Sequence, residues 1–243
     1  MPLLCDIEYS IELKQRGSLM RRCTLLGISI IAAIGIASAG LAAERFDYRV
    51  RADMFDGFAG DEAAFKNAVS IIEERLRHDP DHAEALVWRG AARYWQAGQA
   101  FGAGDVAGAR RLAAAGMADM DRAIALQPDN IGVLVPRASV LLTAARNQRD
   151  PARARDLATR AAAGFEAALA IRQPVFATLD RHNRGEYLSG LADSWALAGD
   201  RDKAENYLRR IVAEVPDSPY AERAAAKLAD WSDRRPLNCQ SCH

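Results

Sequence analysis

The residues best suited to chemistry are the last five of the 243-residue chain, Cys-Gln-Ser-Cys-His. The thiols of Cys239 and Cys242 are three residues apart, and the imidazole of His243 follows directly. Such thiols can close a disulfide in an oxidising compartment, or act in thiol exchange where they begin a helix. With His243 they supply three zinc ligands, and His182 is the one candidate for the fourth.

The same Cys-x-x-Cys-His pattern resembles the c-type haem attachment motif. In that motif the two thiols bind the vinyl groups of one haem, and the adjacent histidine is an axial ligand of the iron. With 4 Cys and 4 His in the chain, composition predicts about 0.001 such patterns by chance. The resemblance implies covalent haem c on Cys239 and Cys242, with His243 as axial ligand. It does not identify the sixth ligand, for which His182 and water are the candidates.

Charge and motif content narrow the remaining function classes. The chain has 32 Lys and Arg against 32 Asp and Glu, which argues against broad electrostatic binding to nucleic acid or anionic membrane. The sequence contains no Ser-His-Asp spacing, HExxH motif, phosphate loop or Gly-rich dinucleotide fingerprint. We therefore expect a protein that is not an enzyme.

The N-terminal region has the pattern of a secretory signal. Arg21 and Arg22 precede an apolar run, residues 25–43, that ends in small residues, which predicts a signal peptide over 1–43 with cleavage after Ala42 or Ala43. Residues 1–19 carry acidic side chains where a basic region is expected, so we place the true start at Met20. An exported, periplasmic protein is expected; the alternative is an uncleaved anchor in the inner membrane.

Residues 188–216 contain two apolar runs of helical spacing, separated by Gly199-Asp200 and ended by Pro216. This segment resembles a tetratricopeptide repeat (TPR), a helix–turn–helix unit of 34 residues. The positions that match the motif are Leu188, Leu191, Ala192, Trp195, Gly199, Ala204, Leu208 and Pro216. The resemblance implies a right-handed solenoid in which stacked helix pairs share one core.

The remaining chain extends this pattern to an all-α, TPR-like domain of about eight helices over residues 61–232. Further helices are expected at 61–77, 83–97, 106–126, 131–145, 151–171 and 220–231. Residues 98–104 and 172–183 are expected to be connectors, and 44–60 an irregular N-terminal arm. Residues 233–243 form a tail that carries the Cys-Gln-Ser-Cys-His motif.

TPR proteins usually bind peptides or partner helices on a concave face, and the register places Trp88, Tyr94 and Trp95 near that face. The alternative is that these aromatics fill gaps between helices. The histidines at 78, 82 and 182 are expected in exposed loops. The sequence thus predicts a scaffold for cell-envelope proteins or peptides that carries haem c in periplasmic electron transfer or complex assembly. A cofactor-free TPR assembly factor or an accessory subunit of an envelope complex is the alternative.

Overall fold

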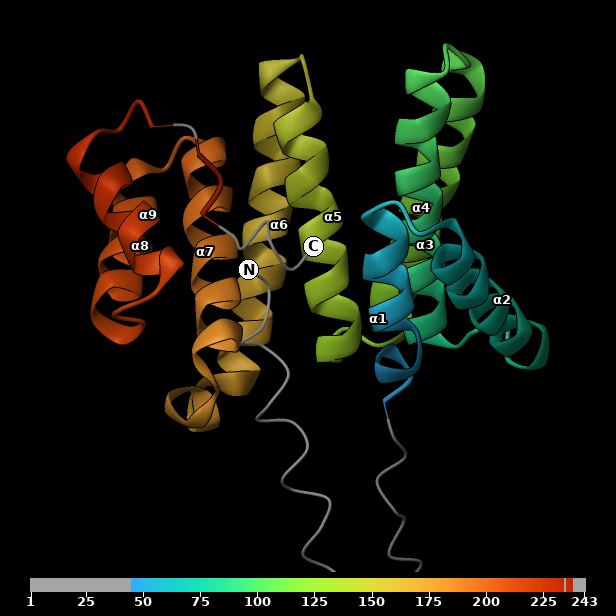
Figure 1. Ribbon diagram of the computed structural model, residues 1–243, viewed down its shortest axis with the longest axis horizontal. Coiled ribbons are helices and arrows are strands. Elements are labelled where there is room, and N and C mark those ends of the chain that lie inside the picture. The colour runs from blue at the N-terminus through green and yellow to red at the C-terminus, as the bar shows by residue number, and fades with distance from the viewer. Residues whose placement is uncertain (1–44, 234, 238–243) are drawn as a thin grey trace, which may run out of the picture. The chain divides into compact units, whose positions relative to one another are not determined.

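The computed structural model describes residues 45–233 and 235–237, and within these ranges it is helical without strands (Figure 1). The helices are α1 (Asp47–Phe58), α2 (Glu62–His78), α3 (Ala83–Gly102), α4 (Val106–Leu126), α5 (Ile131–Asn147), α6 (Pro151–Arg172), the 3-10 helix η1 (Gln173–Thr178), α7 (Arg181–Ala198), α8 (Arg201–Glu214) and α9 (Pro219–Ala229). The predicted all-α class is confirmed. The expected signal peptide and the Cys-Gln-Ser-Cys-His motif lie outside the described residues.

Short polar side chains fix where most of these helices begin. From α2 to α9, each helix follows a residue whose side chain accepts a hydrogen bond from a backbone N–H of the first turn. Asp61 before α2 and Asp150 before α6 are typical, and Pro151 adds a proline at the first helical position. Local sequence therefore specifies these starts.

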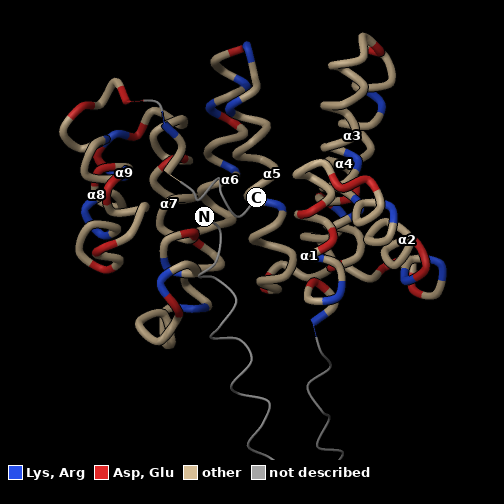
Figure 2. The backbone as a smooth tube through the Cα atoms, in the orientation of Figure 1, with Lys and Arg blue, Asp and Glu red and all other residues tan. Residues whose placement is uncertain are grey.

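The helices pack as sequential antiparallel pairs, α1 with α2, α3 with α4, α5 with α6 and α7 with α8, and α9 lies on α8 (Figure 1). The first helix of each pair also contacts the first helix of the next, so α1, α3, α5 and α7 follow one another. Gly199 joins α7 to α8 with φ at +89°, a conformation that glycine adopts without strain. Basic and acidic residues occur on the helices throughout, without segregation by sign (Figure 2).

The core consists of two hydrophobic clusters that meet at α4 and α5. The first runs from Phe46 to Val133 and the second from Leu134 to Leu237. Met117 and Ile124 of α4 pack against both clusters. Hydrophobic side chains from neighbouring helix pairs therefore share each cluster, and the described residues have two clusters where one core was expected.

The expected irregular arm over residues 44–60 was wrong, because residues 47–58 form α1. Val50 and Met54, four residues apart, are fully buried, and the backbone N–H of Asp47 donates to Glu84 Oε2 of α3 at 3.1 Å. Gly57 is needed for packing, because a Cβ at this position would lie 2.6 Å from Phe65 Cβ. Counting α1, the described residues hold nine α-helices where about eight were expected.

Both expected connectors are partly helical. Residues 98–102 continue α3, so the link to α4 is only Ala103 to Asp105. Residues 173–178 form η1, and the polar run that begins at Asp180 caps and opens α7. Helix propensity penalises glycine by only about 1 kcal/mol relative to alanine, which continued backbone hydrogen bonding and packing can offset.

Candidate functional site

The chain remains in contact with the helices up to Leu237, two residues before the first cysteine of the predicted haem motif. The Leu237 side chain is 2% exposed and belongs to the second core cluster. Its backbone N–H donates to Asp193 Oδ2 at 3.2 Å, and its carbonyl accepts from Arg223 Nη1 at 3.4 Å. Cys239, Cys242 and His243 lie outside the described residues, so the structure gives the approach to the motif but not the motif itself.

Asp193 of α7 supplies the carboxylate that binds this segment. Its side chain is 15% exposed, and Arg146 of α5 donates to the same oxygen, Oδ2, that accepts from Leu237. Burial raises the pKa of the Asp193 carboxyl, while the Arg146 charge and the Leu237 N–H act in the opposite direction. The carboxylate thus joins α5, α7 and the tail at one point.

His182, the predicted additional ligand, lies in the first turn of α7 and is exposed. Tyr220 Oη of α9 donates to Glu186 Oε1 at 2.6 Å and lies 2.9 Å from His182 Nδ1. Because a hydroxyl carries a single proton, His182 Nδ1 is the donor in the second bond.

The three aromatic residues predicted near a groove occupy different environments. Trp88 is 3% exposed and packs edge-on against Phe55, with ring centroids 5.9 Å apart, so it is a core residue. Tyr94 is half-buried, and burial raises its pKa. Trp95 is half-buried, lies 4.6 Å from the Phe65 ring, and borders a hollow of about 360 Å³ between α1, α2 and α3. Of the three, Trp95 is the one that lines a hollow.

The other histidines lie near the turn between α2 and α3. His78 is the last residue of α2 and is exposed. His82 is half-buried, and its Nδ1 accepts from the backbone N–H of Ala85 at 3.1 Å, which caps α3. The expected exposed-loop position is therefore wrong for His82, whose ring has a structural role.

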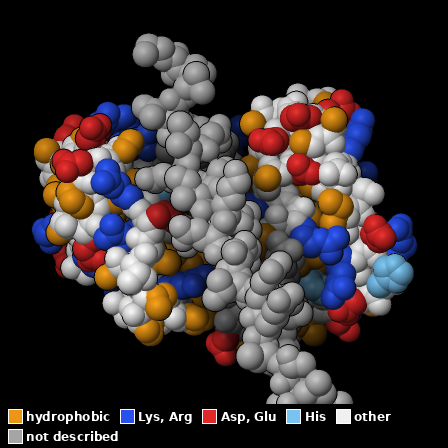
Figure 3. All heavy atoms as spheres, turned by 60° about the horizontal axis from the view of Figure 1, so that its bottom comes forward, with side chains coloured by type: hydrophobic (Ala, Val, Ile, Leu, Met, Phe, Trp, Pro, Cys, Tyr) orange, Lys and Arg blue, Asp and Glu red, His pale blue; other side chains and the backbone are white. Residues whose placement is uncertain are grey.

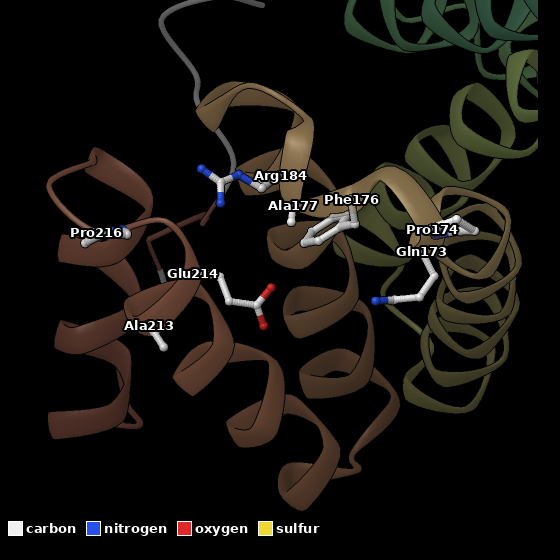
Figure 4. A pocket seen from close by; sticks show the side chains of 8 residues that line it. All are labelled: Gln173, Pro174, Phe176, Ala177, Arg184, Ala213, Glu214 and Pro216. Carbon is white, nitrogen blue, oxygen red and sulfur yellow. The ribbon is translucent and has the colours of Figure 1, made fainter.

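A second hollow, of about 500 Å³, lies between η1, the start of α7 and the end of α8 (Figure 4). Its lining residues are Gln173, Pro174, Phe176, Ala177, Arg184, Ala213, Glu214 and Pro216. The Glu214 carboxylate is already paired with Arg210, 2.7 Å from its Nε. Arg184 is the other charged residue of the lining.

The surface offers little further indication of chemistry. Within residues 45–233 and 235–237, no three His, Cys, Asp or Glu side chains are placed to hold a metal ion. Among the same residues, we find no helix with the length and apolarity required to span a bilayer. Basic, acidic and hydrophobic side chains are interspersed on the face seen in Figure 3.

Comparison with known proteins gave no match to a protein-family model, a curated protein or a solved structure. The function therefore has to be argued from the residues and their arrangement.

Sequence reasoning missed Asp193 and Arg223 as residues that contact the tail, and Arg146 as the partner of Asp193. A charged residue on a predicted helix ordinarily indicates a solvated face. The partners of Leu237 lie 14 and 44 residues away in the chain. Local periodicity carries no signal for such contacts.

Proposed function

We propose that this chain is an exported, TPR-like helical scaffold that carries a covalently attached haem c on its C-terminal tail. It would act with protein partners in periplasmic electron transfer or complex assembly. The observation that carries the proposal is the Cys-Gln-Ser-Cys-His motif in a chain that has only four cysteines. Cleavage of the expected signal peptide removes Cys5 and Cys23, so both remaining cysteines belong to the motif.

The donor set of the motif fits haem c. Cys239 and Cys242 would form the thioether bonds to the porphyrin, and the His243 imidazole would bind the iron. The bound haem would supply one-electron transfer through its ferric and ferrous states. Export supports the assignment, because haem c is attached outside the cytoplasm in the proteins that the motif resembles.

His182 is the candidate in this chain for the sixth ligand. Asp193 and His182 are eleven residues apart on α7, about 17 Å along the helix axis. From Leu237 to His243 the chain has six further residues, with an extended reach of about 20 Å. The Tyr220 hydroxyl, 2.9 Å from His182 Nδ1, orients the His182 ring.

The scaffold part of the proposal is supported by the α7–α8 pair. Leu188, Leu191 and Ala192 are at most 1% exposed, as are Ala204 and Leu208, so these TPR-like positions lie where that motif requires small or apolar residues. The contacts that link α1, α3, α5 and α7 are also those expected of stacked repeats.

The deciding experiment is to export the protein from a host that matures c-type cytochromes and to measure its intact mass and pyridine haemochrome spectrum. We expect a haem-sized increment in mass that is lost in the Cys239→Ala/Cys242→Ala variant. Gln240→Ala, which keeps both thiols and the spacing, is the matched control and should retain the haem. An unmodified mass for the parent protein would contradict the haem assignment.

That outcome would favour the cofactor-free alternative, a TPR-like binding or assembly factor. The half-buried Trp95, beside its hollow between α1, α2 and α3, is the specific observation in favour of that function. Loss of a captured peptide partner in Trp95→Ala, with the fold intact, would support it.

A further inference from the structure

Charged side chains from several helices hold the segment that follows α9. Lys227 of α9 donates to the carbonyl of Trp231 at 2.8 Å and also to that of Asp233. The Arg201 guanidinium of α8 lies 4.7 Å from the centre of the Trp231 ring. Because this segment is not helical, its backbone groups need other partners, and these basic side chains provide some of them.

Leu237 is bound in the way that a docked peptide is bound. Its side chain is buried, its N–H is bound by Asp193, and its carbonyl is bound by Arg223. Recognition of extended peptides uses the same combination of backbone hydrogen bonds and a pocket for a side chain. Leu237 therefore occupies a peptide-binding position on α7 and α9.

The contacts of the tail extend beyond the last two helices, so the tail does more than cover the end of the helical array. A segment that only covered the end of the array would need contacts with α8 and α9. This one extends to α7 through Asp193, and that carboxylate is paired with Arg146 of α5. Removing a carboxylate from water is costly unless it is paired and hydrogen-bonded, and both conditions are met with the tail in place.

We propose that Asp193 and Arg223, with Arg146 paired to the carboxylate, form an anchor whose occupant is the chain's own C-terminal segment at Leu237. The anchor fixes the place at which the Cys-Gln-Ser-Cys-His motif leaves the helices. Two residues of chain span at most about 7 Å, which is the longest backbone separation that the sequence allows between Leu237 and the first cysteine. The anchor stands on its own contacts, and its use in positioning a haem rests on the proposed function.

The first test is amide hydrogen exchange at Leu237, followed by NMR. We expect the Leu237 amide of the parent protein to exchange at least about ten-fold more slowly than an exposed amide, because Asp193 accepts its hydrogen. Asp193→Ala should abolish this protection while the amides of α7 and α8 remain protected. Asp81→Ala, which removes an exposed ion pair with Arg122, is the matched control and should leave Leu237 protected.

The second test measures where the motif lies. A spin label on Cys239 (with the other cysteines replaced) and one on Thr143→Cys, an exposed position of α5, should give a narrow distance distribution. The distribution should broaden in Leu237→Ala, a variant that changes the occupant rather than the helices. A Leu237 amide that exchanges freely in the parent, or distributions equally broad in both proteins, would overturn the anchor.

These tests separate the anchor from the haem assignment. Both can be run on Cys242→Ala, which lacks one thiol of the motif. If Leu237 is protected and the parent protein contains no haem, the anchor proposal is supported and the haem proposal is contradicted. If the protein contains haem and the Leu237 amide is exposed, the haem proposal is supported and the anchor proposal is contradicted.

Discussion

His82 shows how protonation of one side chain is linked to the start of a helix. Its Nδ1 accepts from the Ala85 N–H, and its ring packs edge-on against Phe46 with centroids 5.1 Å apart. Burial lowers the pKa of His82 below its ordinary value of 6.5, and the positive charge of Arg75 lowers it further. A doubly protonated ring has no lone pair to accept with, so protonation removes the cap.

We predict that this linkage appears in the pH dependence of stability. Between the lowered pKa and 6.5, the unfolded chain binds more protons at His82 than the folded chain. The free energy of unfolding should therefore decrease as the pH falls below 6.5. His82→Asn, which caps without titrating, should weaken that dependence in urea titrations across about pH 5 to 7, the range over which histidine titrates. His78→Asn, at an exposed position, should leave it intact.

Trp88 gives a second prediction at the residue scale. Its side chain is buried, so we expect it to contribute to core packing and not to binding. Trp88→Ala should lower the free energy of unfolding by about 3–5 kcal/mol through lost burial and a cavity. Trp88→Phe should cost less, since it keeps a ring and removes an indole N–H that has no hydrogen-bond partner among the described residues. Urea unfolding followed by circular dichroism measures both, and equal losses would contradict the cavity explanation.

At the scale of elements, the spacing between α3 and α4 depends on the close approach of the two helices at Gly90 and Gly116. A Cβ on Gly90 would lie 2.7 Å from the carbonyl oxygen of Gly116 and 2.5 Å from Met120 Cγ. A Cβ on Gly98 of the same helix would meet nothing within 4 Å. The two positions share a helix but differ in their neighbours, so they form a matched pair for substitution.

We predict opposite effects at these positions. Gly90→Ala should destabilise the protein by about 1–3 kcal/mol, because α4 must move to accommodate the methyl group. Gly98→Ala should stabilise it by about 0.5–1 kcal/mol through helix propensity alone. Thermal unfolding of the two variants beside the parent gives the sign of each change. Stabilisation by Gly90→Ala would show that the two helices do not cross closely there.

At the scale of the whole described chain, the two core clusters are coupled through α4. Met117 and Ile124 contact both clusters, so each cluster is covered in part by side chains that it shares with the other. Trp88 and Trp95 report on the first cluster, and Trp195 and Trp231 lie with the second half. The fluorescence of the two groups can therefore be followed separately in tryptophan-to-phenylalanine variants.

We predict a single cooperative unfolding transition. Urea midpoints from the two tryptophan pairs should coincide, because unfolding of one half would expose the surface that it shares with the other. Ile124→Ala should separate the midpoints by weakening the shared boundary, as nearest-neighbour coupling in helical arrays implies. Separate midpoints in the parent protein would contradict this coupling.

The sequence by itself determined the features that depend on near neighbours in the chain. The bounds of α4 agree with the prediction, and the turn at Gly199 was identified, because caps, glycine turns and helical periodicity act within a few residues. The Cys-x-x-Cys-His motif was likewise identified from residue types and spacing alone. The haem it indicates remains a proposal.

Tertiary structure decided what depends on residues far apart in the chain. Helix α1 is held by contacts with α2 and α3, so local pattern described it wrongly. Asp193 has the pattern of a surface charge, yet its partners Arg146 and Leu237 are 47 and 44 residues away. Burial and pairing of a charge depend on which helices meet, and that is settled only when the pairs have packed.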